Sequence, residues 1–269
     1  MIKLIVTDMD GTLLNNKSEI NEEFWEIQKK LAKNGVIFAV ASGRPYYNLV
    51  EKFKSIKNDM LFISENGACV MYKDEEIYSN TLDRKDVFSF LEVCKNIKGA
   101  IPVVCGKKSA YVEKSKFFDE KYNFQDEINK YYNNLEILDN FDSIDDEIFK
   151  VAICDFLGSE QNSHNYFRNI EDKFQVVISG NVWLDLGKLD TSKGTAVEMT
   201  QKNLKISYDE TMIFGDYLND YSMMTSGKYS FAMKNAHPQL KEISNFVTKK
   251  DNNENGVLET IKEYFSDIL

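Results

Sequence analysis

The N-terminal sequence MIKLIVTDMDGTLL, residues 1–14, gives the clearest indication of the fold. Residues 2–7 form an apolar run rich in β-branched side chains, which is typical of a buried strand in a parallel sheet. The run ends at Asp8, and Asp10-Gly11-Thr12 follows as a turn. Two carboxylates therefore lie close together at the carboxyl end of a strand, and ligands bind at that edge of open α/β sheets.

Strands and helices alternate from this stretch onward. Apolar residues at helical spacing predict a helix over residues 20–31, which Gly35 closes. Residues 36–41 form a second buried strand, and Pro45 suits the first turn of a following helix. A third strand is expected at residues 61–64. This alternation is typical of a doubly wound parallel sheet.

The last third of the chain repeats the pattern. A helix is expected from about Ser192 to Asn203, and a strand over 211–214 follows it. Further strands are expected at 231–233 and 246–248, with a closing helix from Val257 onward. We therefore assign residues 1–81 and 187–269 to one α/β core.

The middle of the chain, residues 82–186, is different in character, with few glycines and many aromatic residues. Helical patterns alternate there with short apolar runs. We interpret this segment as an inserted α+β cap domain. Its candidate strands are 101–104, 110–112, 151–155, 175–178 and 183–186.

The composition limits the classes of partner and compartment. The formal net charge is −10, which argues against a nucleic-acid-binding surface and against an anionic membrane. The four cysteines lie far apart without a CxxC pair, as expected for reduced thiols in a cytoplasmic protein. The N-terminal apolar stretch is too short for a signal peptide. The sequence indicates no oligomeric state.

The first two motifs offer phosphate and metal chemistry. Carboxylates at a strand end can share a divalent cation, and an aspartate can attack phosphorus to form an aspartyl phosphate. The alternative for Asp8-Met9-Asp10 is a strand that ends in a polar turn. Ser42-Gly43-Arg44 also follows a buried strand and opens a helix, where backbone N–H groups can hold a phosphate oxygen. A simple serine N-cap explains that motif equally well.

Two later motifs complete the set. Lys193 opens a helix and can balance the charge of phosphate and carboxylates, although a lone lysine is usually a solvated surface charge. Gly215-Asp216-Tyr217-Leu218-Asn219-Asp220 places a second acidic cluster at a strand end. Mg²⁺ prefers oxygen ligands and needs only a few carboxylates. Asp216 with Asp8 and Asp10 meets that requirement, whereas the alternative is a second polar loop.

Taken together, the four motifs resemble the haloacid dehalogenase superfamily of phosphatases, in sequence order and residue type. The long insert before Lys193 is similar to the Cof-type subfamily with its large cap. The resemblance covers essentially the whole chain, and it is specific in the core motifs and loose in the cap. It implies a haloacid-dehalogenase-like core with an inserted cap, a Mg²⁺ cofactor and a small phosphorylated metabolite as substrate, with sugar phosphates first among the candidates.

The resemblance also implies a role for each motif residue. Asp8 is then the nucleophile, and Asp10 is the general acid and base, which also gives its backbone carbonyl to the metal. Asp216 is the further metal ligand. The transferring phosphoryl group is held by Met9 through its backbone, Ser42, Gly43, Lys193 and Asn219. Supporting positions are Asp220, Arg44 and Asn66, of which Asn66 also fits a turn former.

Two positions differ from the family pattern, and two alternative functions would use the same residues. The family often has phenylalanine at the position of Met9, and glycine is common at the position of Lys234. A phosphotransferase or mutase would use the same site with a second hydroxyl in place of water. A non-catalytic phosphate or metal sensor is the rival from another class, but a sensor has no need of Asp10 two residues after a nucleophile.

Overall fold

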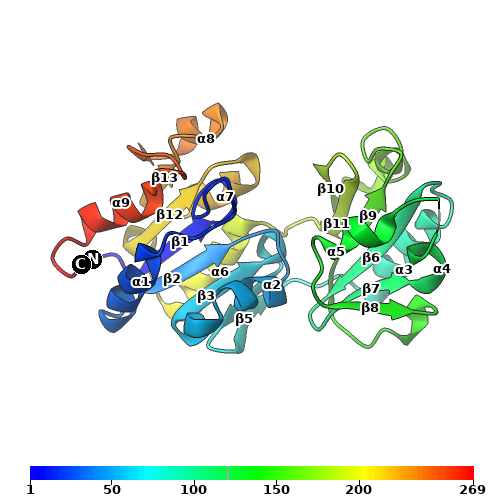
Figure 1. Cartoon of the computed structure of the whole chain (residues 1–269), viewed down its shortest axis with the longest axis horizontal. Coiled ribbons are helices and arrows are strands. Elements are labelled where there is room, and N and C mark those ends of the chain that lie inside the picture. Colours follow the sequence, from blue (N-terminus) through cyan, green and yellow to red (C-terminus); the bar gives the residue numbers. More distant parts are fainter. Residues whose placement is uncertain (120) are drawn as a thin grey trace. The chain divides into compact units, whose positions relative to one another are not determined.

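The computed structural model of the chain describes residues 1–119 and 121–269. The chain forms two compact units (Figure 1). The core unit comprises Met1–Arg44, Leu49–Ser79 and Ser192–Leu269. The cap unit comprises Pro45–Asn48 and Asn80–Thr191.

The core unit contains an eight-stranded sheet in the order β14-β13-β12-β1-β2-β3-β4-β5. All neighbours from β14 to β3 pair parallel, whereas β4 and β5 add antiparallel strands at one edge. The predicted α/β class is confirmed, although β4 and β5 were not expected. The bounds are β1 Leu4–Asp8, β2 Ile37–Ala41, β3 Met60–Ser64, β4 Cys69–Tyr72, β5 Glu75–Ser79, β12 Thr211–Gly215, β13 Tyr229–Ala232 and β14 Phe246–Val247.

Helices cover both faces of this sheet. Figure 1 shows α1 (Glu23–Lys33) in front of the sheet and α6 (Lys193–Leu204) behind it. On the α1 face, aromatic rings pack edge to face, and the ring centroids of Phe24 in α1 and Phe38 in β2 are 5.2 Å apart. The ion pair between Lys262 and Glu23 connects α9 to the same face. The other helices of the core unit are α7 (Tyr221–Met224), α8 (Pro238–Ile243) and α9 (Gly256–Tyr264), and α2 (Tyr46–Lys52) lies across the unit boundary.

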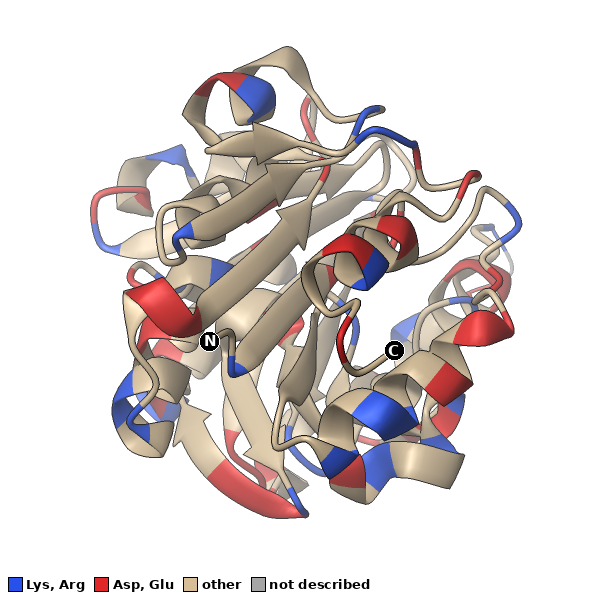
Figure 2. Ribbon diagram, turned by 90° about the vertical axis from the view of Figure 1, so that its left-hand side faces the viewer, with Lys and Arg blue, Asp and Glu red and all other residues tan. Residues whose placement is uncertain are grey.

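The central position of β1 follows from its sequence. Each of its five residues is buried, and β1 pairs with β2 and β12 along its length. A strand covered on both faces needs a continuous apolar run, which Leu4, Ile5 and Val6 supply. Figure 2 shows the result, since Lys, Arg, Asp and Glu lie mainly on helices and loops and the strands carry few of them.

The cap unit contains a six-stranded sheet in the order β10-β11-β9-β6-β7-β8. It includes every predicted cap strand, together with β8, which was not expected. The bounds are β6 Ala100–Gly106, β7 Ala110–Glu113, β8 Leu135–Leu138, β9 Ile148–Asp155, β10 Phe174–Gly180 and β11 Trp183–Lys188, with helices α3 Arg84–Cys94, α4 Lys114–Phe117 and α5 Phe124–Asn129.

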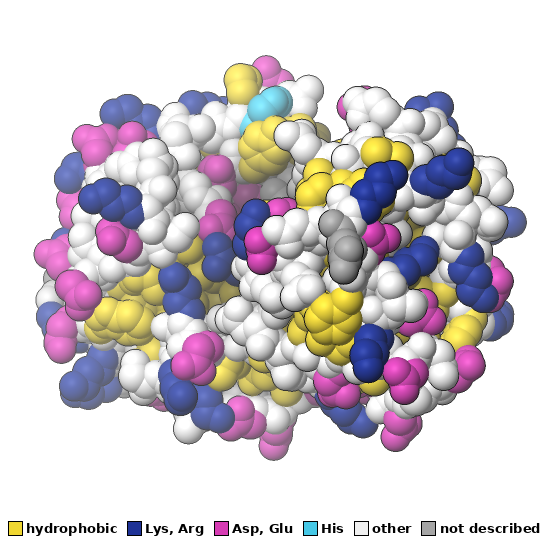
Figure 3. Space-filling model, turned by 45° about the vertical axis from the view of Figure 1, so that its right-hand side comes forward, with side chains coloured by type: hydrophobic (Ala, Val, Ile, Leu, Met, Phe, Trp, Pro, Cys, Tyr) yellow, Lys and Arg dark blue, Asp and Glu magenta, His cyan; other side chains and the backbone are white. Residues whose placement is uncertain are grey.

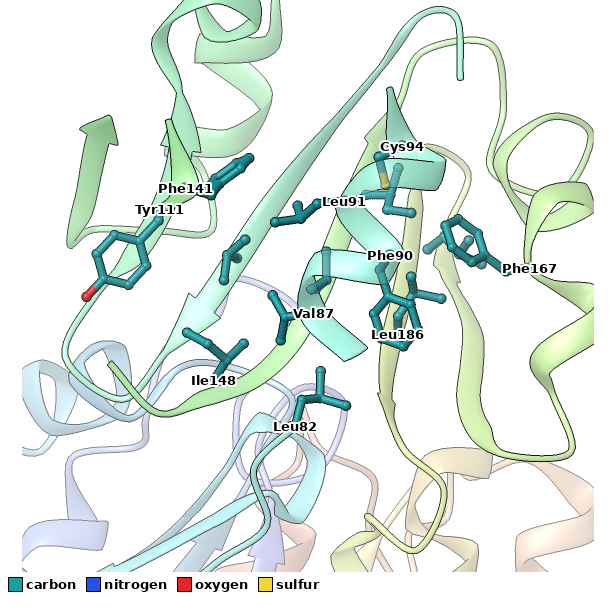
Figure 4. Packing of buried hydrophobic residues seen from close by; sticks show 14 of the residues in the cluster. Leu82, Val87, Phe90, Leu91, Cys94, Tyr111, Phe141, Ile148, Phe167 and Leu186 are labelled. Atoms are coloured by element: carbon teal, nitrogen blue, oxygen red, sulfur yellow. The ribbon is translucent and has the colours of Figure 1, made fainter. Parts of the chain in front are cut away.

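Successive side chains of the cap strands point to opposite faces of the sheet, so the hydrophobic core of the cap unit lies in two layers. Val104, Val151 and Leu186 point to the face under α3, where Val87, Phe90, Leu91 and Cys94 close the cluster (Figure 4). Val103, Ala152 and Trp183 point to the opposite face, against Phe117 of α4 and Ile128 of α5. Burial of both sheet faces gives the inserted segment a hydrophobic core of its own.

Two linkers connect the units, and they lie side by side. Asn80 Nδ2 donates to Asp190 Oδ1 at 2.8 Å and to Thr191 Oγ1 at 3.0 Å.

The remaining short helices are 3₁₀ turns: η1 Lys54–Asp59, η2 Glu65–Gly67, η3 Phe141–Ser143, η4 Ser163–Tyr166, η5 Arg168–Ile170, η6 Tyr208–Glu210 and η7 Leu218–Asp220. None of the helices among the described residues combines the length and apolar character needed to cross a membrane. Acidic and basic side chains are interspersed on the face shown in Figure 3.

Candidate active site

The site begins at the carboxyl end of β1. Asp8 is the last residue of the strand and only 6% exposed, and Met9 after it is fully buried. The chain then turns back on itself, with Leu13 N–H donating to Asp8 O and Leu14 N–H donating to Met9 O. This tight turn fixes the Asp8 carboxyl group at the edge of the sheet.

Lys193 connects Asp8 to the loop after β12. The lysine is the first residue of α6, and Ser192 caps that helix by accepting a hydrogen bond from Thr195 N–H. The Lys193 ammonium donates to Asp8 Oδ1 and, at 2.6 Å, to Asp220 Oδ1. Lys193 is 1% exposed and Asp220 is fully buried. The lysine is therefore a buried counter-ion and not the solvated surface charge of the alternative interpretation.

Asp220 also orders the loop that carries Asp216. Its Oδ2 accepts hydrogen bonds from the backbone N–H groups of Asp216 (2.9 Å) and Tyr217 (3.1 Å). Asp216 Oδ1 in turn accepts a hydrogen bond from Thr12 Oγ1 at 2.8 Å. Gly11 has φ +82°, and a Cβ at this position would overlap the Asp216 carboxylate. The loops after β1 and β12 are thus in direct contact.

Arg44 and Asp10 form the outer side of the site. Arg44 Nε and Nη2 donate to the two Asp10 carboxylate oxygens at 3.1 and 2.6 Å, and both residues are partly exposed. Ser42 Oγ accepts a hydrogen bond from Arg44 N–H at 3.2 Å, as expected where a loop opens a helix. In this arrangement the Asp10 carboxylate faces the guanidinium and stays outside the buried carboxylate cluster.

The structure brings together most of the residues named from the sequence. Asp8, Lys193, Asp216 and Asp220 form one buried or half-buried cluster, and Ser42, Gly43 and Arg44 follow β2, the strand next to β1. Asn66 lies against Gly43. Asn219 lies exposed on η7, and the described residues include no hydrogen-bond partner for its side chain.

Sequence reasoning missed three residues that hold this arrangement. Thr12 binds Asp216, Ser222 Oγ accepts a hydrogen bond from Gly194 N–H, and Asn235 Nδ2 donates to Gly11 O at 2.8 Å. Thr12 lies within the Asp10-Gly11-Thr12 turn and Asn235 follows Lys234, but short polar side chains carry no pattern that distinguishes a partner far along the chain from a local turn. Ser222 follows Asp220 closely, and the same limit applies to it.

Burial and crowding of charge perturb the titration of the cluster. Burial, and next the charge of Asp220, raise the pKa of Asp8 well above its usual value, although Lys193 opposes them. Burial also raises the pKa of Asp216 to about 6 against the hydrogen bond from Thr12. Burial alone would lower the pKa of the Lys193 ammonium, but Asp8 and Asp220 outweigh it and raise that pKa. Ionised carboxylates in this cluster therefore need cations.

The donor set fits a hard divalent cation. Asp8, Asp216 and Asp220 each offer a carboxylate oxygen, and these atoms lie within 4.8 Å of one another. Asp220 already binds Lys193 and two backbone N–H groups, so Asp8 and Asp216 are the better ligands. With Lys193, the three carboxylates leave a net formal charge that one divalent cation balances. Oxygen ligands of this type suit Mg²⁺.

A family model and several known proteins match the chain over almost its whole length. The model of the haloacid dehalogenase-like hydrolase family matches residues 5–261. The chain is 33% identical over 265 residues to 5-amino-6-(5-phospho-D-ribitylamino)uracil phosphatase YbjI of Escherichia coli, covering 97% of this chain and 95% of that protein. It is 26% identical to phosphatase YwpJ of Bacillus subtilis, covering 97% and 99%.

Solved structures show the same architecture. A crystal structure from Streptococcus mutans superposes with a TM-score of 0.84 at 30% identity, covering 99% of this chain and 100% of that one. A haloacid dehalogenase-like hydrolase from Bacteroides thetaiotaomicron gives a TM-score of 0.82 at 25% identity, covering 98% and 100%. The likeness extends over the core and cap units alike.

Proposed function

The chain belongs to the haloacid dehalogenase-like hydrolases, and from this premise we propose that it is a Mg²⁺-dependent phosphatase that acts on small phosphorylated metabolites through a phospho-aspartate at Asp8. The observation that carries the proposal is the buried lysine between two carboxylates. Lys193 orients Asp8 Oδ1 and leaves the second oxygen of that carboxylate for chemistry. Such a fixed carboxylate at a strand end suits a nucleophile.

The reaction requires two displacements at phosphorus. In the first, an Asp8 carboxylate oxygen forms a bond to phosphorus, the ester P–O bond breaks, and Asp10 gives a proton to the departing oxygen. In the second, Asp10 takes a proton from water, the water oxygen bonds to phosphorus, and the bond to Asp8 breaks. Because Asp10 is partly exposed and paired with Arg44, its carboxylate must leave the guanidinium to reach the ester oxygen.

The other motif residues would stabilise the phosphoryl group. We assign its oxygens to the backbone at Met9, to Ser42 and Gly43, and to the Lys193 ammonium, with Asn219 joining them from η7. Asp8, Asp216 and the backbone carbonyl of Asp10 are the proposed ligands of Mg²⁺, which when bound would neutralise phosphoryl charge. Asp220 positions both the Lys193 ammonium and the loop that carries Asp216 through its hydrogen bonds.

The substrate class follows by analogy. The name of the E. coli relative describes a phosphate ester on a ribityl chain. We therefore propose phosphates of sugars or sugar alcohols as substrates of this chain, and we assign selection among them to the cap unit, because the core motifs read only the phosphoryl group. The four cysteines are free and buried, which agrees with our proposal of a cytoplasmic location.

A substrate screen tests the proposal. The parent protein and Asp8→Asn are assayed with Mg²⁺ on a few dozen phosphorylated metabolites, with release of inorganic phosphate as the readout. We expect hydrolysis by the parent and background rates for the variant. Adding an acceptor alcohol separates a phosphatase from a phosphotransferase, since a transferase forms a new ester. Equal rates for parent and variant would rule out the proposed role of Asp8.

A further inference from the structure

The turn η2, Glu65–Gly67, contains three successive residues with positive φ: Glu65 (50°), Asn66 (54°) and Gly67 (102°). Left-handed backbone at a non-glycine residue costs on the order of 1–3 kcal/mol and persists only where the surroundings enforce it. Such conformations cluster at functional sites. The turn also follows directly after β3, at the same edge of the sheet as Asp8.

Backbone contacts connect this turn to two proposed phosphate-binding elements. Glu65 N–H donates to Arg44 O at 3.1 Å, and Asn66 N–H donates to Ser42 O at 3.0 Å. On the other side, a Cβ on Gly67 would overlap Ser192 O, directly before Lys193. The turn therefore holds the Ser42–Arg44 loop and the start of α6 at a fixed separation.

The Asn66 side chain lies over Gly43. Both ends of its amide, Oδ1 and Nδ2, are 3.1 Å from the position that a Cβ of Gly43 would occupy. Asn66 Oδ1 is buried and has no hydrogen-bond partner among the described residues. An unpaired buried polar atom costs about 1–3 kcal/mol. A glycine would satisfy the positive φ without this cost, so the turn alone does not explain the asparagine.

We propose that the Asn66 amide is a further contact of the phosphoryl group that the Ser42–Arg44 loop binds. Rotation of the amide exchanges its two ends at little steric cost, so Nδ2 can donate to a phosphoryl oxygen beside Gly43. The inference rests on the proposed phosphatase function. It adds to the site a side-chain donor that comes from the loop after β3, between Ser42 and Lys193.

Two substitutions separate the amide from the turn. Asn66→Gly keeps the positive φ and removes the amide. Asn66→Asp keeps the shape but replaces the donor with a carboxylate that repels phosphate. The control is Asn255→Gly, because Asn255 also has positive φ (62°) and lies at the N-terminus of α9. Thermal unfolding of each variant shows whether it is folded.

The readout is the Kd of inorganic phosphate, measured by calorimetry with Mg²⁺ present. We expect Asn66→Gly to raise this Kd by about five-fold or more, as for a lost hydrogen bond of about 1 kcal/mol, and Asn66→Asp to raise it further. Asn255→Gly should leave it unchanged. If Asn66→Gly raises the Kd by less than about five-fold, or if all three variants raise it equally, the inference is wrong.

Turnover of p-nitrophenyl phosphate by the parent protein distinguishes this failure from failure of the proposed function. An active parent with an unchanged Kd in Asn66→Gly contradicts only the role of Asn66. A parent that neither turns over the ester nor binds phosphate contradicts both. Because the Kd is measured directly, a slow chemical step cannot mimic weak phosphate binding.

Discussion

Replacing Lys193 with methionine tests the electrostatic core of the site. Lys193 is 1% exposed and donates to two carboxylates, Asp8 and Asp220, of which Asp220 is fully buried. Methionine keeps most of the length of the side chain and removes the ammonium, so two buried carboxylates lose their counter-ion. Removal of one partner from a buried ion pair costs about 3–5 kcal/mol. We expect the free energy of unfolding of Lys193→Met to fall by that amount.

The assay is equilibrium urea unfolding at neutral pH without added metal. Lys57→Met is the matched control, because Lys57 pairs with Asp74 at 2.9 Å on the surface, with both side chains substantially exposed. Exposed pairs of this kind contribute about 0–1 kcal/mol. The double variant Lys193→Met/Asp220→Asn should recover part of the loss, because one of the uncompensated charges is gone. Equal destabilisation by Lys193→Met and Lys57→Met would show that the Lys193 ammonium is not needed as a buried counter-ion.

Three further outcomes are expected. Gly67→Ala should destabilise the protein by about 1–3 kcal/mol more than Gly35→Ala in thermal unfolding, because both glycines have positive φ but only the Cβ at 67 overlaps the backbone at Ser192; equal effects would show that the backbone at Ser192 moves away from the added Cβ at little cost. Excess chelator should abolish turnover, and Mg²⁺ should restore it better than Ca²⁺, which prefers a looser geometry; full activity in chelator without bound metal would contradict the role of Asp216. The hydrogen bond from Lys3 and those from Ser207 lower the pKa of Glu210 from 4.5 to about 2, so this carboxylate stabilises the fold above pH 4.5 and loses that effect as the pH falls towards 2; urea unfolding of Glu210→Gln across this range should differ from the parent only at the higher pH.

The core of the fold could be predicted from the sequence because buried strands and helices carry apolar residues in short runs or at regular spacing. The run at residues 2–7 predicted a buried strand, and the structure places β1 inside the sheet between β12 and β2. The antiparallel strands β4 and β5 escaped prediction. β4 is apolar but only four residues long, and β5 opens with Glu75 and Glu76 and is partly exposed at the sheet edge, so neither gives a clear strand pattern. Strand β8 is likewise half exposed.

The candidate site was predictable to the extent that its chemistry lies in short motifs. Asp8, Lys193, Asp216 and Asp220 were named from strand ends and helix starts, and the structure brings them into one cluster. Pairings across long sequence separations could not be predicted, such as that of Thr12 with Asp216. The Arg44–Asp10 pair also needed the structure, since neither residue type fixes its partner.

The proposed phospho-aspartate at Asp8 can be trapped in a variant that forms it but cannot hydrolyse it. Asp10→Asn removes the base that activates water, while p-nitrophenyl phosphate has a leaving group that needs little help from an acid. The variant is mixed with this ester and Mg²⁺, quenched in acid within one turnover and digested for peptide mass analysis. We predict one phosphoryl group on the peptide that contains Asp8, and none after the same treatment of Asp8→Asn/Asp10→Asn. Release of one equivalent of p-nitrophenol with no phosphoryl group on Asp8 would contradict the phospho-aspartate mechanism.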